Sequence, residues 1–320
     1  MQFYDAKSPD DMGLNPSEVI NLIKTKWDEI HSNTNVFRYK IANEEKRFVN
    51  NKYYLQLNPN RGVKRRTPEQ MENISQPFDK NKFNFCKVSK DEVMFHFKQE
   101  KDSYHTVLIN ASPINKYHSL LCPFLEDCLP QIITKDSLML AVKFMLMAEN
   151  RDIRLGYNSL LAMASVNHLH FHIFIVENDL PVETVKCIQV KGPLYRFENI
   201  YPIPAFCFEI GSVGTKIDDV YKLLEYFLHK NIAHNMFLTR GNSVASNNEV
   251  LRILIWPRTS CLHIKQFDVF NIACCELSGW LPVYNEETFI KLKEEDIESE
   301  LRKWKIDDFD KLCEDLKALY

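Results

Sequence analysis

Three histidines, His168, His170 and His172, alternate with apolar residues, and four more apolar residues follow up to Val176. Alternate residues of a β-strand lie on one face of the sheet. The spacing therefore predicts a strand over 167–176 with the three imidazoles on one face and the intervening side chains in the core. Three imidazoles on one face suit metal binding, proton transfer or nucleophilic attack on phosphorus. The alternative is that they are ordinary polar residues on the solvent face of a half-buried strand.

The composition is that of a globular protein with a large core. Of the 320 residues, 45% are apolar and 26% are charged, and the length allows one or two domains. A formal net charge of −3 gives no electrostatic reason to expect nucleic acid as a partner. The 8 glycines are few for this length and argue against a glycine-rich phosphate-binding loop.

The cysteines and the first residues indicate a cytoplasmic protein. The 9 cysteines are odd in number and form no C-x-x-C pair, which is typical of free thiols in a reducing compartment. The first residues lack the basic and apolar regions of a signal peptide. No run of about 18 uncharged apolar residues occurs, so we expect no membrane-spanning helix.

The hydrophobic periodicity predicts an α+β fold. Helical spacing occurs over about 16–31, 136–150, 217–229, 286–297 and 306–319, and strand-like stretches over 53–58, 92–97, 106–110, 117–123, 153–158, 205–210, 234–240 and 250–257. The turn between 110 and 117 predicts a hairpin, and we expect 153–158 to pair antiparallel with the histidine strand. After residue 200 the order strand, helix, strand, strand recurs without the histidines, which suggests an internal duplication. We accordingly expect an N-terminal helical extension over 1–50 and a catalytic region over 51–320, divided into a histidine-bearing half (51–200) and a second half (201–320).

A basic run begins at Arg61. Arg61, Lys64, Arg65 and Arg66 put four cations into six residues. Guanidinium groups match phosphate oxygens with paired donors, so the run is a candidate anion-binding segment. A solvated loop is the alternative.

Several blocks of the sequence resemble known families. The segment Ser165–His172 resembles the histidine-triad motif, and Tyr117–Pro123 resembles the upstream histidine strand of that superfamily. Further blocks, in order along about 37–283, are similar to the GDP-D-glucose phosphorylase family: Gln56–Asn58, the basic run through Arg66, Phe83–Phe85, Leu180–Glu183, Ala233–Gly241, Trp256–Ser260 and Cys275–Gly279. The plant GDP-L-galactose phosphorylases of the same wider group end their motif in Gln, where this chain has His172.

The chain departs from the GDP-D-glucose phosphorylase pattern in two places. Leu161 and Ala162 stand where the family tends to have glycines, and Trp280 stands where it tends to have a histidine. We expect the first departure to stiffen the loop that approaches the phosphates. Neither departure touches the three histidines.

The resemblance implies an antiparallel sheet with flanking helices, similar to the duplicated arrangement of galactose-1-phosphate uridylyltransferase. It also implies that GDP-D-glucose and phosphate give D-glucose 1-phosphate and GDP, with no metal and no cofactor. By motif position His170 is the nucleophile that carries GMP, His168 and His172 flank it, and His118 supports them from the neighbouring strand. Imidazole chemistry agrees, because a neutral imidazole with a pKa near about 6.5 attacks phosphorus at pH 7 without a strong base.

The resemblance also places residues around the phosphates. Asn158 would donate to the α-phosphate and Ser165 to the bridging oxygen of the leaving group. A phosphorylase must bind inorganic phosphate as a second anion, which requires surplus cations near the histidines. The candidates are Lys64, Arg65, Arg66, Arg240, Arg258 and Lys265, each of which is otherwise an ordinary surface charge. The sequence assigns no guanine pocket, no sugar pocket and no oligomeric state.

Three other functions stay open at the level of sequence. One is a catalytic metal site, since imidazole is a common zinc ligand, although three histidines of one strand rarely reach one tetrahedral ion. Another is a guanine-nucleotide-binding protein without turnover, which the altered loop at Leu161 and Ala162 would permit. The third is a related enzyme, either a sugar-nucleotide hydrolase or a GDP-L-galactose phosphorylase.

Overall fold

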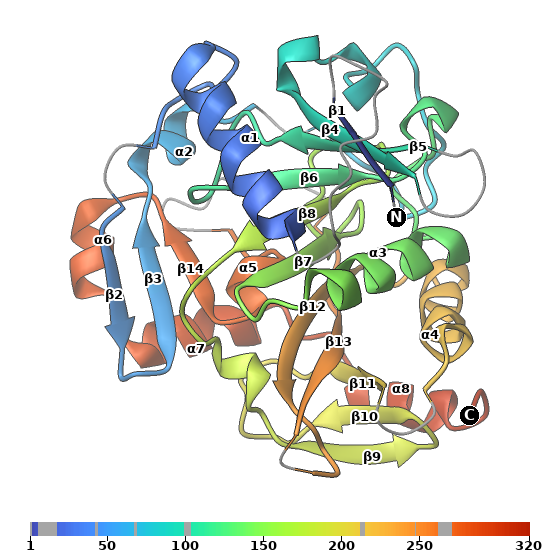
Figure 1. The fold of residues 1–320 in the computed structure, drawn as a ribbon. Coiled ribbons are helices and arrows are strands. Elements are labelled where there is room, and N and C mark those ends of the chain that lie inside the picture. The colour runs from blue at the N-terminus through green and yellow to red at the C-terminus, as the bar shows by residue number, and fades with distance from the viewer. Residues whose placement is uncertain are drawn as a thin grey trace.

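A computed structural model describes residues 2–5, 18–41, 44–66, 69–98, 104–211, 215–246, 248–261 and 271–320. Its main feature is one sheet of 11 strands in the order β1-β4-β5-β6-β8-β7-β12-β13-β11-β10-β9 (Figure 1). Neighbouring strands pair antiparallel throughout this sheet. The strands are β1 (Gln2–Asp5), β4 (Val93–Lys98), β5 (Tyr104–Ile109), β6 (Ser119–Cys122), β7 (Ile153–Asn158), β8 (Phe171–Ile175), β9 (Cys187–Lys191), β10 (Leu194–Phe197), β11 (Phe206–Ile210), β12 (His234–Asn242) and β13 (Glu249–Pro257).

The central strands have a symmetric order. The set β6-β8-β7 is followed by β12-β13-β11, so each half contributes a strand, a helix and two paired strands. The helices are α3 (Lys135–Ala148) and α4 (Ile217–His229), and the two halves meet where Asn158 of β7 lies opposite Asn235 of β12. This arrangement confirms the expected α+β class and the recurring element order. The hairpin of β5 with β6 and the antiparallel pairing of β7 with β8 are also as expected.

Helices cover one face of the large sheet. Apolar side chains of α1 (Val19–Asn33), α3, α4 and α8 (Phe309–Leu316) form one core with the sheet, and Phe171 and Ile173 of β8 lie in it. The start of α3 illustrates the local cause. Thr134 caps the helix by accepting from the backbone N–H of Ser137 at 3.2 Å, and its apolar stripe then faces the sheet.

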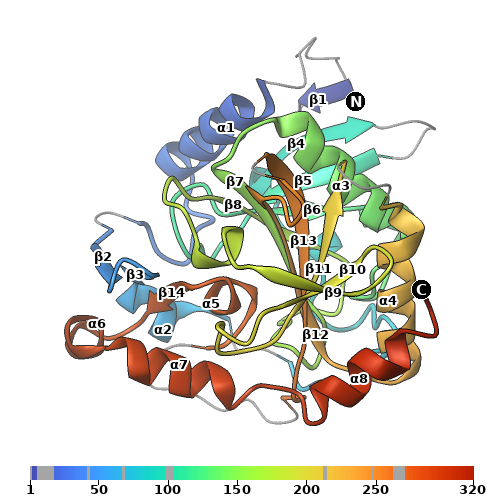
Figure 2. The same ribbon diagram turned by 90° about the horizontal axis from the view of Figure 1, so that it is seen from below.

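A smaller sheet covers part of the other face. It has the order β14-β3-β2, formed by β14 (Trp280–Val283), β3 (Tyr53–Leu57) and β2 (Lys46–Val49). With α5 (Cys274–Leu277), α6 (Glu286–Lys291) and α7 (Glu294–Arg302) it forms a second core against residues such as Phe174 and Trp256. Figure 2 shows this small sheet and α5 on the side of the molecule opposite to α3 and α4. The side chains of β8 therefore alternate between the two cores, as predicted, with Phe171 packed toward the helices and Phe174 toward the small sheet.

The strand that carries the histidines is shorter than predicted. β8 begins at Phe171, and its pairing with β7 ends where His172 lies opposite Gly156. Before that point the side-chain amide of Gln131 lies between the two segments. Its Nε2 donates to the carbonyls of Asn158 and His170, both at 3.1 Å, and its Oε1 accepts from the N–H of His170 at 2.8 Å. The prediction of a strand from 167 is wrong, because before Phe171 the side-chain hydrogen bonds of a buried glutamine stand in place of backbone hydrogen bonds between the two segments.

Other elements differ from the predictions at their ends. The helix expected over 286–297 is two helices, α6 and α7, because Asp296 accepts from the backbone N–H of Lys293 and starts a new helix there. The expected start of α1 before Glu18 lies outside the described residues.

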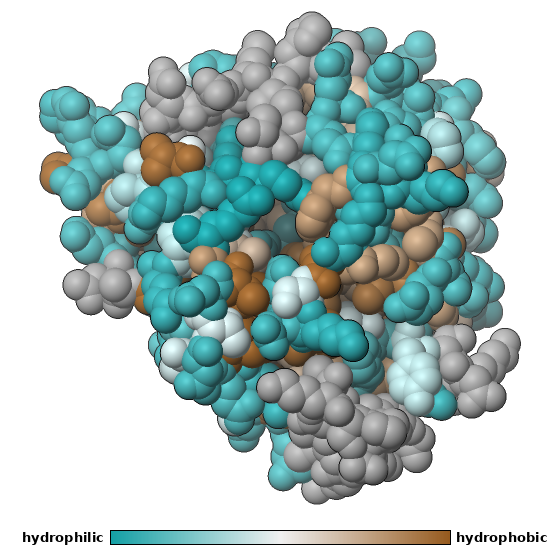
Figure 3. All heavy atoms as spheres, turned by 90° about the horizontal axis from the view of Figure 1, so that it is seen from above, coloured by the Kyte–Doolittle hydropathy of each residue, from teal (hydrophilic) through white to brown (hydrophobic). Residues whose placement is uncertain are grey.

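None of the helices in the described ranges is long and apolar enough to cross a bilayer. Figure 3 shows a mainly hydrophilic face, with apolar side chains gathered around a hollow near its middle.

Candidate active site

The three histidines form a row of neighbouring rings at the start of β8. The ring centroids of His170 and His172 are 5.0 Å apart, and Phe85 lies 4.9 Å from His170 and 5.7 Å from His168. His168 and His170 are 1% and 2% exposed, whereas His172 is half-buried. The loss of regular strand geometry before Phe171 therefore does not separate the row.

The hydrogen bonds of His170 fix its tautomer. Its Nδ1 lies 2.8 Å from the backbone carbonyl of His168, which can only accept, so Nδ1 carries the proton. In the neutral ring the lone pair is then on Nε2. His168 is the reverse case, because its Nδ1 lies 3.1 Å from the backbone N–H of Phe85 and must accept. The geometry thus gives His170 a nucleophilic Nε2.

His118 fixes the orientation of His172 from the adjacent strand. The Nδ1 of His118 accepts from the backbone N–H of Ile114 at 2.9 Å, so a neutral His118 carries its proton on Nε2. That Nε2 lies 3.0 Å from Nδ1 of His172, to which it donates in this tautomer, and 3.2 Å from the amide nitrogen of Asn110. The neutral ring of His172 therefore carries its proton on Nε2, which makes this atom a hydrogen-bond donor. On the other side, Phe174 stacks on His172 at 5.7 Å.

Burial keeps these histidines neutral at physiological pH. Desolvation lowers the pKa of His168 and of His170 to about 4, and for His170 the bond to the His168 carbonyl offsets part of the effect. Desolvation followed by the neighbouring histidine charges lowers the pKa of His118 and of His172 well below the usual value. Within the described ranges, no three His, Cys, Asp or Glu side chains are grouped to hold a metal ion.

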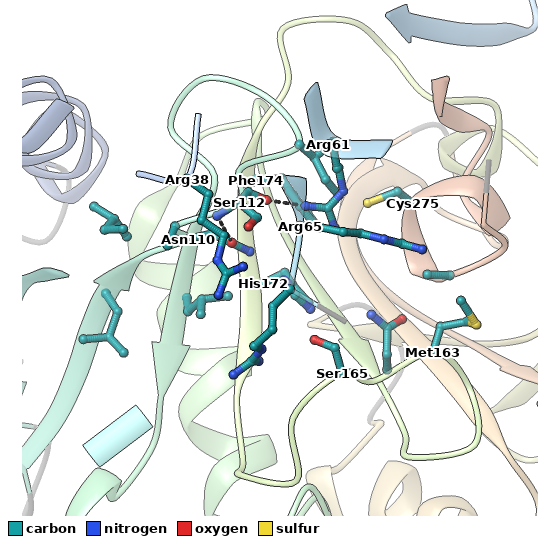
Figure 4. Close-up of a pocket in the computed structure, with 18 of the residues that line it drawn as sticks. Arg38, Arg61, Arg65, Asn110, Ser112, Met163, Ser165, His172, Phe174 and Cys275 are labelled. Carbon is teal, nitrogen blue, oxygen red and sulfur yellow. Dashed lines mark hydrogen bonds between the residues drawn. The ribbon is translucent and has the colours of Figure 1, made fainter. Parts of the chain in front are cut away.

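A cavity of about 330 Å³ opens beside His172 and contains a cluster of arginines. Arg38, Arg61, Arg65 and Arg66 line it, and Figure 4 shows Arg38, Arg61 and Arg65 arranged around His172. Arg61 is held in α2 (Pro59–Lys64), whose start is capped by Asn58, and its guanidinium donates to the carbonyl of Ser112. These cations belong to the expected anion-binding segment, except Arg38, which the sequence reasoning did not single out.

Arg66 has the features of a group that awaits an anion. Its guanidinium lies 3.6 Å above the ring of Phe83, and its Nη1 is buried without a hydrogen-bond partner among the described residues. Burial, and after it the charge of Arg38, lowers the pKa of Arg66 to about 10. The carboxylates of Glu69 and Glu92 favour the charged form of Arg66 but leave its Nη1 without a described partner, so this group can donate to a bound phosphate.

Asn158 and Ser165 line the same cavity, and Asn158 lies where β7 pairs with β12 of the second half. The Oδ1 of Asn158 accepts from Nδ2 of Asn235 at 2.6 Å and from the backbone N–H of Cys274 at 3.0 Å. The oxygen is thereby occupied, and the Nδ2 group is left to donate. Asn158 is therefore oriented as a donor by residues that come from the other half of the chain.

Two residues that depart from the family pattern have structural partners here. Trp280 is fully buried, donates to Oε1 of Gln56 at 3.1 Å, and packs edge-on against Phe174 at 5.1 Å. It therefore supports the ring that stacks on His172. Ala162 lies in the buried loop after β7, and its carbonyl accepts from Asn235 at 2.7 Å.

The structure does not bring all predicted cations to the cavity. Arg240 faces the helix-covered side of the sheet and donates to the carbonyl of Met145 in α3, because it lies at an odd step from Asn235 along β12. Arg258 is buried, bonds Asn235 and the carbonyl of Ile272, lies 4.2 Å from the Trp304 ring, and is not part of the cavity wall. Lys64 is exposed and does not line the cavity. Lys265 lies outside the described residues.

Two carboxylates of the cavity wall, Glu92 and Glu276, were missed by sequence reasoning. Glu276 is 3% exposed, and burial raises its pKa to about 7. Arg38 was missed as well. Glu276 lies in the block Cys275–Gly279 that resembles the family, whereas no sequence signal connects Glu92 or Arg38 to the histidines, because the topology alone places them together.

The row of histidines at the start of β8, an inner strand of an antiparallel α+β sheet, defines a protein of the histidine-triad class. Comparisons with known proteins narrow this class. A family model described as "GDPGP1-like, N-terminal domain" matches residues 18–174, and one described as "GDPGP1-like, C-terminal domain" matches residues 183–318. The chain therefore belongs to the GDPGP1-like family.

Relatives in several organisms are similar over most of the chain. "GDP-D-glucose phosphorylase 1" of Danio rerio is 34% identical over 294 residues, which cover 88% of this chain and 85% of the relative. The human protein of the same name is 34% identical over 81% of this chain and 72% of its own length. "GDP-L-galactose phosphorylase 2" of Arabidopsis thaliana is 34% identical over 86% of this chain and 70% of its own length.

A solved structure shares the fold. Yeast Ap4A phosphorylase Apa2, in complex with Ap4A, superposes with a TM-score of 0.62 at 14% sequence identity, over 92% of this chain and 99% of the yeast chain. The AMP complex of the same enzyme gives a TM-score of 0.63 at 15% identity. At such identity the likeness concerns the fold.

Proposed function

We propose that this protein catalyses the phosphorolysis of GDP-D-glucose to D-glucose 1-phosphate and GDP, through a guanylyl group carried on Nε2 of His170. The observation that carries the proposal is the state of His170. Its Nδ1–H is held by the His168 carbonyl at 2.8 Å, and burial lowers the pKa of the ring to about 4, so Nε2 carries the lone pair of a neutral imidazole at neutral pH. The names of the relatives in zebrafish, human and Arabidopsis supply the class of substrate.

The reaction is a double displacement at the α-phosphorus. In the first step Nε2 of His170 forms a bond to the α-phosphorus, and the bond from that phosphorus to the bridging oxygen breaks. The electron pair leaves with D-glucose 1-phosphate. In the second step an oxygen of inorganic phosphate attacks the same phosphorus, the phosphorus–nitrogen bond breaks, and GDP is released with the imidazole restored. The Nδ1 proton stays on the ring throughout, held by the His168 carbonyl.

The remaining groups of the site have matching roles in this scheme. His172 presents a donor at Nε2, and Asn158 presents its Nδ2 group, so both can stabilise charge on the α-phosphate oxygens as it develops. The arginines of the cavity wall provide a site for the incoming phosphate, which a hydrolase would not require. Ser165, which lines the same cavity, is assigned to the bridging oxygen of the leaving group.

The proposal is tested by intact-mass analysis of the protein mixed with GDP-D-glucose. We expect a GMP-sized adduct without phosphate, also in the presence of a chelator, and its loss with release of GDP once phosphate is added. The variant His170→Asn should form no adduct and lose turnover, while His229→Asn, on the exposed end of α4, serves as the matched control. An adduct that decays to GMP in phosphate-free buffer would identify a hydrolase instead. Formation of the adduct by His170→Asn would exclude His170 as the nucleophile.

A further inference from the structure

The cavity has two chemically different ends on either side of His172. On β6 Leu120 lies directly opposite His172, and Leu108 of β5 lies opposite Leu120, so the strand residues on this side of the cavity are apolar. On β7 the partner of His172 is Gly156, and the wall continues through Asn158 toward Cys274. Arg38 and Asn110, which follows β5, lie on one side of His172, and Met163 and Cys275 lie on the other (Figure 4), so each side also carries residues of the other chemical type.

The apolar end has the walls that a planar base requires. Phe85, Leu108 and Leu120 belong to one small core cluster, and together with Phe83 and Val88 they line the cavity. Aromatic and aliphatic faces of this kind stack on nucleobases independently of base identity. The opposite end, with Asn271, Cys274, Glu276 and Tyr284, offers polar groups that suit a polyhydroxylated sugar. The base and the sugar of a sugar nucleotide therefore have different preferred ends.

One carboxylate lies at the apolar end. Glu92 lines the cavity and is half-buried, at the end of the short 3₁₀ helix Lys90–Glu92. Its Oε1 accepts from the backbone N–H of Ser89 at 3.0 Å, which fixes the plane of the group. No described residue bonds its Oε2. The neighbouring charges of Arg38 and Arg66 favour the ionised form, against the effect of burial, which raises the pKa of this group.

We infer that Glu92 reads the guanine base of the substrate by accepting hydrogen bonds from its N1–H and 2-amino groups. Guanine presents these two donors side by side, and a carboxylate has two oxygens that accept in parallel. Adenine has no donor at its N1 position, and hypoxanthine lacks the 2-amino group. The inference rests on the proposed function, to which it adds the group that selects the base.

The capping role of Glu92 does not account for its place in the cavity. The bond to Ser89 uses one oxygen and would be made equally by glutamine, which is an accepted residue at this position of a capping box. The variant Glu92→Gln therefore keeps the cap and the shape, and changes only what the side chain presents to the base. Its amide N–H₂ would meet the N–H groups of guanine, donor against donor, but would match the 2-oxo group of xanthine.

Binding of GDP, IDP and XDP by titration calorimetry tests the inference apart from turnover. We expect the wild-type protein to bind GDP about tenfold or more tightly than IDP, since a hydrogen bond to a charged group contributes that much or more. In Glu92→Gln the affinity for GDP should fall at least about tenfold, and the preference for GDP over IDP should disappear. The affinity of this variant for XDP should be higher than that of the wild-type protein. Asp91→Asn, which alters the adjacent exposed carboxylate, should leave all three affinities unchanged.

The outcomes separate the inference from the proposed function. Equal affinity of the wild-type protein for GDP and IDP would overturn the role of Glu92, whether or not the variant folds. An unchanged preference for GDP in a folded Glu92→Gln protein would do the same. If the wild-type protein bound no GDP and formed no adduct with GDP-D-glucose, the proposed function itself would fail.

Discussion

At the scale of single residues, backbone groups decide what each histidine can do. A carbonyl holds the Nδ1 proton of His170, and a backbone N–H of Ile114 forces His118 to donate to His172. The alternation in the sequence predicts that the rings lie together. It does not predict the tautomers, because the groups that set them come from the histidine backbone itself and from a turn before β6.

The lowered pKa of His170 predicts an unusual pH dependence for the first half-reaction. A histidine with an ordinary pKa near about 6.5 would lose nucleophilicity between pH 7 and 6. Because burial lowers the pKa of His170 to about 4, we expect the rate of adduct formation to change little from pH 8 to 6 and to fall only below pH 5. Rapid-quench measurement of D-glucose 1-phosphate release without added phosphate gives this rate free of phosphate titration. If the rate of adduct formation instead fell to half near the ordinary histidine pKa, the ring of His170 would be protonated at a higher pH than its burial indicates.

Arg66 should act in the second half-reaction more than in the first. Its Nη1 is buried without a partner among the described residues, so a bound phosphate would supply the missing acceptor. In Arg66→Gln we expect the KM for phosphate to rise at least about tenfold, since a hydrogen bond between charged groups is worth about 1.5–3 kcal/mol. Adduct formation should change less. Arg66→Lys should recover part of the effect, Lys80→Gln on the exposed surface is the control, and an unchanged KM would place phosphate elsewhere.

At the scale of elements, the nucleophile is held by a side chain rather than by the sheet. Gln131 uses every polar atom of its amide on His170 and Asn158, and its own backbone bonds Asn167 and Tyr157. It is 1% exposed and comes from the loop before α3. The alternating pattern of the histidine segment continues past the point where this glutamine enters, so the pattern alone predicts too long a strand.

Replacement of Gln131 should therefore affect catalysis beyond its effect on stability. Gln131→Ala leaves the N–H of His170 and two carbonyls unsatisfied in a buried place, which we expect to cost about 2–4 kcal/mol of unfolding free energy. The rate of adduct formation should fall at least about tenfold while GDP affinity changes little, because the loss concerns the placement of Nε2. Gln189→Ala, at an exposed position of β9, is the control. A variant that is less stable but forms the adduct at the normal rate would reduce Gln131 to a structural residue.

Residue patterns predicted the elements better than the site. The limits of α4 and β7 follow from their own periodicity and agree with the structure. Arg240 shows why the site was harder. Its block resembles the family, but its side chain faces the helices, since the face of a strand residue is decided by register with neighbours that the sequence does not show.

At the scale of the whole molecule, the two halves build one site. Asn235 and Cys274, from the half without the histidines, orient Asn158, and Trp280 of the small sheet supports the ring that stacks on His172. Gly156 makes this close packing possible, since a Cβ there would lie 2.5 Å from the sulfur of Cys274. The second half thus retains a function in the site although it has no histidine row.

Burying so many histidines should make the fold sensitive to acid. In the described ranges, five buried histidines and the half-buried His172 have a pKa lowered by desolvation; the five are His105, His118, His168, His170 and His234. In the unfolded chain these histidines bind protons below about pH 6.5. In the folded protein the pKa of His105, His168, His170 and His234 is about 4, so these four rings stay neutral until the pH falls to that value. The unfolded state therefore binds more protons between these values, and the free energy of unfolding must fall as the pH falls through this window. Glu276 and Glu92 act in the opposite direction, because burial raises their pKa, that of Glu276 to about 7, and their contribution is lost as the pH rises, but they are two groups against six.

We accordingly expect the urea midpoint of unfolding to fall steeply between pH 7 and pH 5. His105 lies outside the active site, packed against Phe97 and Phe124, and allows the cause to be tested. His105→Gln should be less stable than the wild-type protein at pH 7. Its free energy of unfolding should nevertheless fall less between pH 7 and pH 5, by roughly 1–2 kcal/mol, because the variant lacks one histidine that binds a proton only in the unfolded chain. His229→Gln on the surface is the control. Equal acid sensitivity of His105→Gln and the wild-type protein would mean that the carboxylates, and not the buried histidines, set the stability of this fold in acid.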